Sequence, residues 1–255
     1  MREVSFAILA YDDAPSLPGV AAEVLAALSK VASRFELLVV DDGSRDGTAK
    51  VAEDLALLHR EIRVLRHPRN RGVGAAFRSA MSAARFGVLG YIDGDGQYEG
   101  ADLALLFAQI DSADVVSGCR VRRADPRLRS IASGAYRILL RGLFGLALRD
   151  VNSGLKLYRR WVIENALSLE SAGAFFDAEV LIRARARGAR IVEVPIGHRP
   201  RRHGRALGLT RRSVLGILQG CLSPSMEPFR AGTLRAALLV RALRWLHALL
   251  RLRAS

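Results

Sequence analysis

Short runs of apolar, β-branched residues alternate with segments of helical length over the first two-thirds of this 255-residue sequence. Runs such as residues 4–10, 36–40 and 88–92 have the length and composition of buried strands. An alternation of this kind is typical of βαβ units, which build a mostly parallel, doubly wound sheet with helices on both faces. We therefore predict an α/β fold of that class.

The predicted elements follow one another without an internal repeat. Strands are expected at residues 4–10, 36–40, 62–66, 88–92, 114–117 and 190–195, with a further extended segment at 155–158. Helices are expected at residues 18–29, 48–59, 74–85, 101–110, 127–148 and 177–187. Since ligands of such sheets bind beyond the carboxyl ends of the strands, the loops after the strands are where a site is expected.

The charge of the chain is concentrated near its C-terminus. The net charge is +14, yet residues 194–255 contain 12 arginines and a single acidic residue, Glu227. The composition therefore divides the chain into a nearly neutral α/β domain, residues 1–209, and a basic helical tail, residues 210–255. A nucleic-acid-binding body would itself carry a basic face and aromatic stacking platforms, so we expect no nucleic-acid partner.

The tail has the pattern of an amphipathic helix that lies on a membrane surface. At about 100° per residue, the leucines and the tryptophan share one broad face, made of Leu238, Leu239, Leu243, Trp245, Leu246, Leu249 and Leu250. Arg241 and Arg244 lie opposite and would contact anionic headgroups. The same pattern also suits a helix packed on the body of the protein, and this alternative stays open.

Other features of the sequence concern its location in the cell. The first ten residues lack the basic region and the long apolar core of a signal peptide. Cys119 and Cys221 are far apart and match no metal or redox spacing, as expected for reduced thiols. Every window of 18 residues contains a charge, which argues against a transmembrane helix. We expect a cytoplasmic protein, peripheral on the inner face of the membrane.

Two acidic loops follow predicted strands. Asp41 and Asp42 come directly after the second strand, and Asp93 and Asp95 flank a glycine after the fourth. Carboxylate oxygens are the ligands that Mg²⁺ and Mn²⁺ prefer, and such sites usually share the metal with substrate phosphates. Either loop alone could be a solvated turn that caps the next helix. Two such loops on one sheet favour a cation or a hydrogen-bonding ligand.

Five motifs in a fixed order carry a resemblance to a known family. They are VVDDGSRDGT at 39–48, NRGVGAAFRSAM at 70–81, YIDGDGQY at 91–98, DVNSGLKLYRR at 150–160 and FFDAEVLIRARARGARIVEVPIGHRPRRHGR at 175–205. The sequence resembles the family-2 glycosyltransferases of the GT-A fold over roughly residues 3–205. Within them it resembles the branch of dolichol- or polyprenol-phosphate sugar synthases.

The resemblance implies a nucleotide-diphospho-sugar donor and a divalent metal, Mg²⁺ or Mn²⁺. The positions that match nucleotide-binding residues of the family are Ala10, Tyr11, Asp13, Asp42 and Asp93. Those that match its metal motif are Asp93, Asp95 and Gln97. Asp95 would hold the metal that stabilises the leaving diphosphate as a Lewis acid, and is therefore named as catalytic.

The later motifs would build the acceptor side. The resemblance implies acceptor or phosphate contacts from Arg120, Ser153, Lys156 and Arg202. It implies an inverting transfer to a polyprenyl-phosphate-type lipid, which needs positioning more than deprotonation. If the acceptor is instead a hydroxyl of a polysaccharide or glycolipid, Asp177 is the expected general base. A third hypothesis is a module without catalytic activity that binds anions or membranes through the tail.

Overall fold

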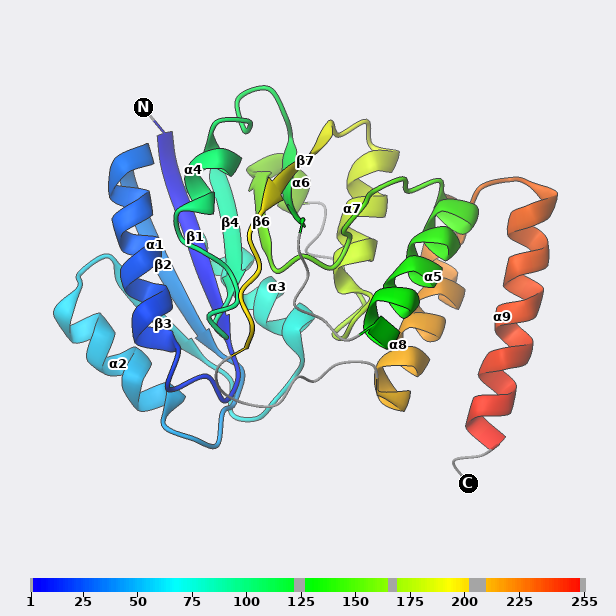
Figure 1. Ribbon diagram of the computed structural model, residues 1–255, viewed down its shortest axis with the longest axis horizontal. Helices are drawn as coiled ribbons and strands as arrows, with labels where there is room; N and C mark the ends of the chain where they lie inside the picture. Colours follow the sequence, from blue (N-terminus) through cyan, green and yellow to red (C-terminus); the bar gives the residue numbers. More distant parts are fainter. Residues whose placement is uncertain (1, 122–126, 165–168, 202–209, 253–255) are drawn as a thin grey trace.

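The centre of the computed structural model is a seven-stranded sheet (Figure 1). The structure describes all residues except 1, 122–126, 165–168, 202–209 and 253–255. Its strands are β1 (Arg2–Ala10), β2 (Ala32–Asp41), β3 (Ile62–Arg66), β4 (Val88–Asp93), β5 (Val115–Arg120), β6 (Leu155–Arg159) and β7 (Ile191–Ile196). They are arranged in the order β3-β2-β1-β4-β6-β5-β7. β6 runs antiparallel to both of its neighbours, and the other pairs are parallel.

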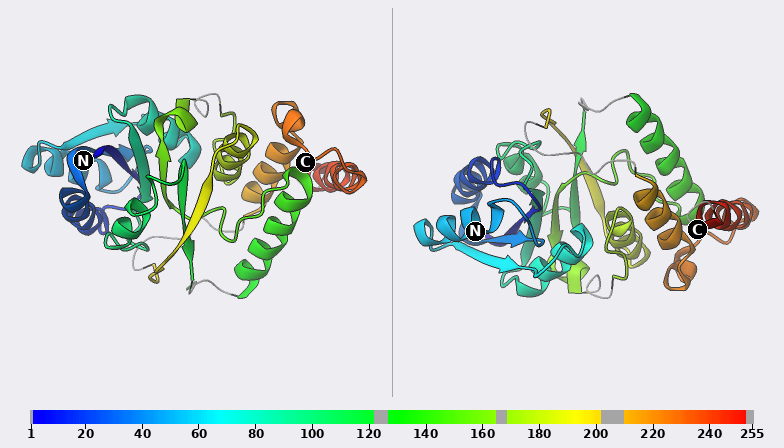
Figure 2. Two further views of the ribbon diagram at one scale, coloured as in Figure 1. Left: turned by 90° about the horizontal axis from the view of Figure 1, so that it is seen from above. Right: turned by 90° about the horizontal axis from the view of Figure 1, so that it is seen from below.

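Helices cover both faces of the sheet (Figure 2). They are α1 (Leu17–Val31), α2 (Thr48–Leu58), α3 (Val73–Ala83), α4 (Asp102–Phe107), α5 (Arg127–Phe144), α6 (Arg160–Glu164), α7 (Phe176–Ala186), α8 (Arg211–Leu222) and α9 (Leu234–Leu252), with a 3₁₀ helix, η1 (Pro224–Phe229). Helices α1, α2 and α4 share one core with the sheet, while α3, α5 and α7 share the other. Helices α5, α8 and α9 lie beyond α7 (Figures 1 and 2).

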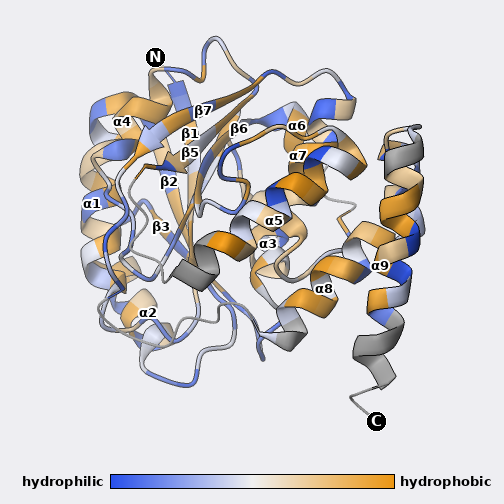
Figure 3. Ribbon diagram, turned by 45° about the vertical axis from the view of Figure 1, so that its right-hand side comes forward, coloured by the Kyte–Doolittle hydropathy of each residue, from blue (hydrophilic) through white to orange (hydrophobic). Residues whose placement is uncertain are grey.

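The strand residues explain this two-sided core. In β1, Phe6 and Ile8 pack toward α1, while Ala7 and Leu9 pack toward α3, as the period of two in a strand requires. Hydrophobic residues accordingly run along the strands in the middle of the molecule (Figure 3). Because both faces are covered, the strands read as continuous apolar runs. The predicted doubly wound, mostly parallel α/β sheet is confirmed.

The predicted elements differ from the structure mainly at their ends. The helix expected at 127–148 ends at Phe144, because Gly145 follows with a positive φ of 66° that terminates the helix. The second strand begins at Ala32, earlier than residue 36, because its first residues pair with the start of β1. The extended segment at 155–158 is a strand, and its antiparallel pairing with β4 was not predicted.

The helices of the tail pack against the α/β body. Leu218 and Cys221 of α8 and Met226 of η1 are buried in the same core as α7. Gly220 lies directly on the ring of Phe175, where a Cβ would come within 2.2 Å of Cδ1. Both cysteines are free thiols, as expected. The predicted boundary at residue 209 falls in a segment outside the described residues.

Helix α9 divides its apolar residues between two sides. Leu243 is buried, and Leu239 packs on α5 at Gly142. By contrast, Leu238 and Trp245 are 54% and 68% exposed. The broad apolar face expected for this helix is therefore covered by the body of the protein along one edge and exposed along the other, because the leucines occupy more of the helix circumference than one contact surface can cover. No described helix is apolar over a stretch long enough to cross a bilayer.

Two glycines of α8 test whether this helix is an integral part of the fold. Gly220→Ala should destabilise the protein by about 1–3 kcal/mol, because its methyl group would overlap Phe175. Gly216→Ala is the matched control, since a Cβ there meets nothing within 4 Å and alanine favours a helix by about 0.5–1 kcal/mol. Urea unfolding of both variants measures the difference. Equal stability of the two would show that α8 does not pack as described.

Candidate active site

The candidate site lies at the carboxyl edge of the sheet, where the sequence placed it. The loops after β1, β2 and β4 meet there, because Asp42 N donates to Ala10 O at 2.9 Å and Gly94 N donates to Leu9 O at 2.8 Å. Since β6 runs antiparallel to β4, the loop that precedes it, residues 150–154, reaches the same edge. One edge therefore collects the predicted donor-side and acceptor-side motifs.

The loop after β1 is tied to the loop after β2. Asp12, in the left-handed region with a φ of 54°, donates its N–H to Ser44 Oγ at 3.0 Å. Asp13 N donates to Thr48 Oγ1 at 2.9 Å, and Asp13 Oδ2 accepts from Tyr11 N at 3.1 Å. The predicted nucleotide-binding residues Ala10, Tyr11 and Asp13 thus lie where the loop after β1 is hydrogen-bonded to the loop after β2.

Asp42 is buried and organises the segment that enters α3. Its Oδ1 accepts from Arg71 N at 2.9 Å and lies 2.6 Å from His67 Nδ1, while its Oδ2 accepts from Gly72 N at 2.8 Å. The other ring nitrogen of His67 lies 2.8 Å from Ser79 Oγ. A carboxylate offers about four lone pairs, so these bonds fix its orientation and leave capacity for one ligand N–H.

The turn after β4 brings two carboxylates onto a tightly packed backbone. A Cβ at position 154 would lie 1.8 Å from Asp93 Oδ2, so glycine is required where the acceptor loop meets Asp93. Asp95 Oδ1 accepts from Gln97 N at 3.0 Å, and its Oδ2 accepts from Arg201 Nη2 at 2.5 Å. Gln97 Nε2 in turn donates to the carbonyl of Arg199 at 3.1 Å.

Burial and mutual repulsion perturb the acids of this edge. Burial raises the pKa of Asp93 well above its ordinary value, and the neighbouring charges of Asp95 and Asp177 add to the rise. Burial also raises the pKa of Asp13 to about 6, again with a contribution from Asp95. Groups perturbed in this way cluster at functional sites.

A buried lysine lies behind these acids. The side chain of Lys156 is 0% exposed, and its Nζ donates to Asp177 Oδ1 at 2.7 Å, to Tyr91 Oη at 3.3 Å and to the carbonyl of Ser153. Tyr91 Oη also donates to Asp177 Oδ1 at 2.6 Å. Asp177 is thus held by two donors, and Lys156 opposes the rise that burial causes in the pKa of this carboxyl.

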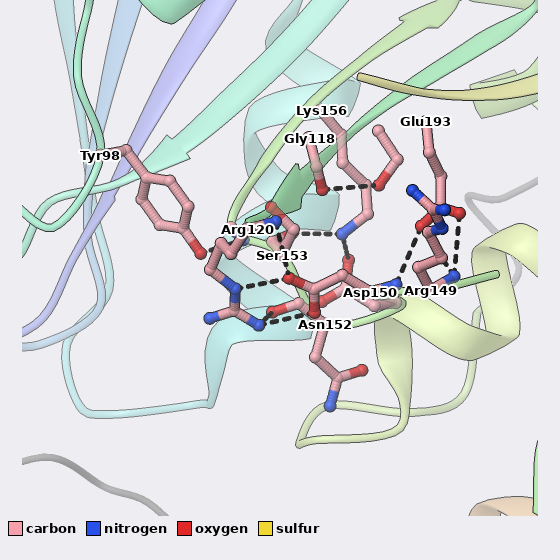
Figure 4. A network of polar contacts seen from close by, with 12 residues as sticks. Tyr98, Gly118, Arg120, Arg149, Asp150, Asn152, Ser153, Lys156 and Glu193 are labelled. Carbon is pink, nitrogen blue, oxygen red and sulfur yellow. Dashed lines mark hydrogen bonds and ion pairs between the residues drawn. The ribbon is translucent and has the colours of Figure 1, made fainter. Parts of the chain in front are cut away.

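The predicted phosphate ligand Arg120 is paired within the chain (Figure 4). Its Nε and Nη2 form a bidentate ion pair with Asp150 at 2.6 and 2.7 Å, and Nη2 also donates to the carbonyl of Asn152 at 3.1 Å. Ser153 is fully buried, and its Oγ has no hydrogen-bond partner among the described residues. A buried hydroxyl without a hydrogen-bond partner is uncommon in proteins.

A cavity of ≈ 350 Å³ opens beside this ion pair. Its lining includes Arg120 and Asp150 together with Arg137 of α5 and Arg149. The arginines make the wall predominantly positive. Arg202, the remaining predicted phosphate ligand, lies outside the described residues.

Several residues of the site were not predicted from the sequence. Tyr91 and Tyr98 look like core aromatics of their segments, yet Tyr91 Oη contacts Asp177 and Tyr98 Oη accepts from Gly154 N at 2.6 Å. Tyr91, Tyr98 and Asp150 stand inside two of the five motifs, and that position was the available signal. Arg201 stands in a basic run where its neighbours compete as candidates, so no local pattern distinguished it.

The residues present fit a divalent cation shared with a ligand. The donor set is made of hard carboxylate oxygens, and the guanidinium of Arg201 already places a cation on Asp95. Within the described residues, no group of three or more His, Cys, Asp or Glu side chains could hold a metal ion by itself. A metal here would need further ligands, such as the oxygens of a diphosphate.

Comparison with known proteins places the chain in a family. The family model "Glycosyl transferase family 2" matches residues 5–166, so the chain belongs to glycosyl transferase family 2, as its motifs predicted. The predicted class of enzyme, a glycosyltransferase, is confirmed with it.

Similar proteins bear names of the predicted branch. Polyprenol monophosphomannose synthase of Mycolicibacterium smegmatis is 31% identical over 73% of this chain and 73% of its own. Undecaprenyl-phosphate mannosyltransferase of Micrococcus luteus is 29% identical over 87% of this chain and 95% of its own. Undecaprenyl-phosphate 4-deoxy-4-formamido-L-arabinose transferase of Aeromonas hydrophila is 29% identical, and the chain spans only 62% of its length.

Solved structures share the fold. Glucosyl-3-phosphoglycerate synthase from Mycobacterium tuberculosis superimposes with a TM-score of 0.68 at 20% identity, covering 88% of this chain and 81% of that one. The same enzyme has been solved with Mn²⁺, uridine-diphosphate and phosphoglyceric acid, with a TM-score of 0.68 at 19% identity. The predicted GT-A fold is confirmed.

The perturbed carboxyl of Asp13 leads to a stability test. Its pKa of about 6 lies above the ordinary value of 3.8, so the native state retains a proton that the unfolded state loses between these values. The free energy of unfolding should therefore fall as pH rises from about 4 to 6, by up to roughly 3 kcal/mol. Asp13→Asn should be more stable than the wild type at pH 7.5 but not at pH 4.

Urea unfolding in metal-free buffer at both pH values measures this difference. Asp54→Asn, a substitution of an exposed carboxylate on α2, is the control and should show no such pH dependence. A stability gain of Asp13→Asn that is equal at pH 4 and pH 7.5 would contradict the assigned pKa.

Proposed function

We propose that the protein transfers a sugar from a nucleotide-diphospho-sugar to a polyprenyl-phosphate-type lipid, with inversion and with Mg²⁺ or Mn²⁺ as cofactor. The observation that carries the proposal is the turn of Asp93 and Asp95 at the end of β4, opposite the acceptor loop at Gly154. Support comes from relatives whose names specify undecaprenyl phosphate or polyprenol.

The donor would lie over the ends of β1, β2 and β4. Asp42 has capacity for one more N–H, which suits the imino group of a base, and the loop of Ala10, Tyr11 and Asp13 would line the same pocket. Asp95 would hold the metal with Asp93 and the amide oxygen of Gln97. When bound, the metal stabilises the charge that develops on the leaving diphosphate.

The state of Asp177 favours a phosphate acceptor over a hydroxyl. A general base needs a lone pair directed at the proton that it removes. Burial raises the pKa of Asp177, but its Oδ1 already accepts from Lys156 and Tyr91, so this oxygen is turned toward these two donors and not toward a substrate hydroxyl. A lipid phosphate is anionic before it reacts, so it needs no base. With this acceptor, Asp177 positions Lys156 and the Ser153 loop.

The acceptor phosphate would meet the cavity beside Arg120. The arginines that line this cavity match the charge and the planar geometry of phosphate recognition. The unpaired hydroxyl of Ser153 would donate to the acceptor or to the transferred sugar. Since the acceptor attacks in a single displacement, the configuration at the sugar carbon inverts.

A donor and acceptor panel tests the proposed function. UDP- and GDP-sugars are incubated with Mn²⁺ or Mg²⁺, with and without undecaprenyl phosphate, and the release of nucleotide diphosphate and the formation of glycolipid are measured. We expect transfer to the lipid phosphate, and Asp95→Asn should reduce it by at least about 10²-fold, since it removes a charge that acts on the transition state. Asp54→Asn is the matched control.

The same panel separates the alternatives. Transfer to a polysaccharide or glycolipid hydroxyl, but not to the lipid phosphate, would support the second hypothesis and return Asp177 to the role of base. Absence of nucleotide release with every donor would favour a module without catalytic activity. Full activity of Asp95→Asn would remove the metal role from this residue.

We also infer that the protein lies on the cytoplasmic face of the membrane through α9 and the adjoining face of α5. Exposed apolar residues are found on both helices, namely Ile131, Ile138, Leu238, Trp245 and Leu246. Exposed arginines, Arg141 on α5 and Arg241 and Arg244 on α9, accompany them. Arginine with leucine and tryptophan suits the interface of an anionic bilayer. The inner side of α9 packs on the body, so the lipid contact falls to its outer side.

Charge substitutions on α9 test this surface. Leu238→Glu combined with Trp245→Glu should reduce sedimentation with anionic liposomes at least about tenfold, because carboxylates oppose insertion and are repelled by the headgroups. The matched control is Leu57→Glu with Leu58→Glu on α2, which are 85% and 77% exposed at the opposite end of the molecule (Figure 1). Equal loss of binding in both variants would show that α9 is not the anchor.

A further inference from the structure

Arg201 forms an ion pair with one of the two carboxylate oxygens of Asp95. Its Nη2 lies 2.5 Å from Asp95 Oδ2, and the side chains are 25% and 7% exposed, respectively. The other oxygen, Oδ1, accepts from Gln97 N at 3.0 Å. Both oxygens of the carboxylate that faces the donor side therefore already have a donor from the chain itself.

The segment after β7 delivers this arginine from an anchored backbone. Gly197 N donates to Asp102 Oδ2 at 3.0 Å, and Arg199 N donates to Gln97 O at 2.8 Å. The side chain of Arg199 pairs with Glu23 at 2.9 Å and Glu99 at 3.2 Å. Residues 197–199 are thus bound to α1, to the loop before α4 and to the first residue of α4, and Arg201 lies two residues further along the chain.

We propose that Arg201 is the counter-cation of Asp95 while no metal is bound, and that a divalent metal must displace it. This rests on the proposed function, in which Asp95 is a metal ligand. Asp95 Oδ2 has a second lone pair, but a metal bound there would lie close to the guanidinium, and the repulsion between the two cations favours displacement of Arg201. The metal alone therefore competes with a guanidinium held close by the chain.

The nucleotide diphosphate resolves this competition. Its oxygens supply further ligands to the metal. Its negative charge also balances the guanidinium of Arg201 after the metal has displaced it. Metal and nucleotide therefore bind with positive coupling, and the coupling passes through Arg201. By linkage, each ligand raises the affinity for the other by the same factor.

The experiment titrates Mn²⁺ into the nucleotide-free protein and follows free Mn²⁺ by electron paramagnetic resonance. Arg201→Gln should bind Mn²⁺ alone at least about tenfold more tightly than the wild type, since the competing cation is removed. Arg199→Gln is the matched control, because it loosens the same segment without touching Asp95, and it should bind Mn²⁺ like the wild type. The increase in melting temperature on adding Mn²⁺ should likewise be larger for Arg201→Gln than for the wild type. The same melting curve shows whether the variant is folded.

A second titration adds UDP or GDP. The nucleotide should tighten Mn²⁺ binding more in the wild type than in Arg201→Gln. Unchanged Mn²⁺ affinity in Arg201→Gln, or an equal rise in Arg199→Gln, would overturn the inference. Asp95→Asn separates it from the proposed function: if this variant binds Mn²⁺ with nucleotide as the wild type does, the metal role of Asp95 itself is wrong and the inference falls with it.

Discussion

Repulsion among buried carboxylates is the constraint around which the site is arranged. Parallel strands end at one edge of the sheet, so the acids that follow β1 and β4 converge there, and Asp177 at the start of α7 joins them. In a medium of low polarity such charges raise one another's pKa unless cations balance them. Lys156 supplies one fixed balancing charge from inside the sheet. An unpaired buried lysine would be strongly unfavourable, so the pair with Asp177 is a condition of the fold as well as of the site.

The antiparallel strand β6 is what places that lysine. Its register sets Lys156 opposite Tyr91 of β4, and this pairing brings Nζ, the phenol and Asp177 together. The period of the apolar runs indicated a strand at 155–158 but not its neighbours, because strand order depends on which surfaces pack in three dimensions. The sequence therefore predicted Lys156 as a site residue without its partner. The resemblance implied that Lys156 is a phosphate ligand, and this role remains a prediction. The buried side chain lies beneath the carboxylates of the site.

For the other elements and residues as well, local features could be predicted from the sequence and long-range pairings could not. Local patterns predicted which segments are helices or strands and that the site lies at the carboxyl edge of the sheet. They could do so because a strand buried on both faces has a continuous apolar sequence. The pairing of Arg120 with Asp150 joins residues 30 positions apart and left no local trace. In α9, the broad arc of leucines predicted an amphipathic helix correctly. It could not show that Leu243 packs inward and Trp245 outward, because α9 rests on α5, which is far away in the sequence, as well as on α8.

The cations of the site differ in how they are held, and this difference suits the two substrates of the proposed function. Lys156 is on a central strand, and its buried ammonium group is held by Asp177, Tyr91 and the carbonyl of Ser153, so its position is fixed. Arg201 is on the irregular segment that follows β7, two residues beyond Arg199, and its partner Asp95 is in the turn after β4. In the proposed function, a divalent metal adds two positive charges beside Asp95, and a cation on an irregular segment can move away more readily than one on a central strand. Under the proposed function, the fixed cation would thus serve the acceptor side and the exchangeable one the donor side.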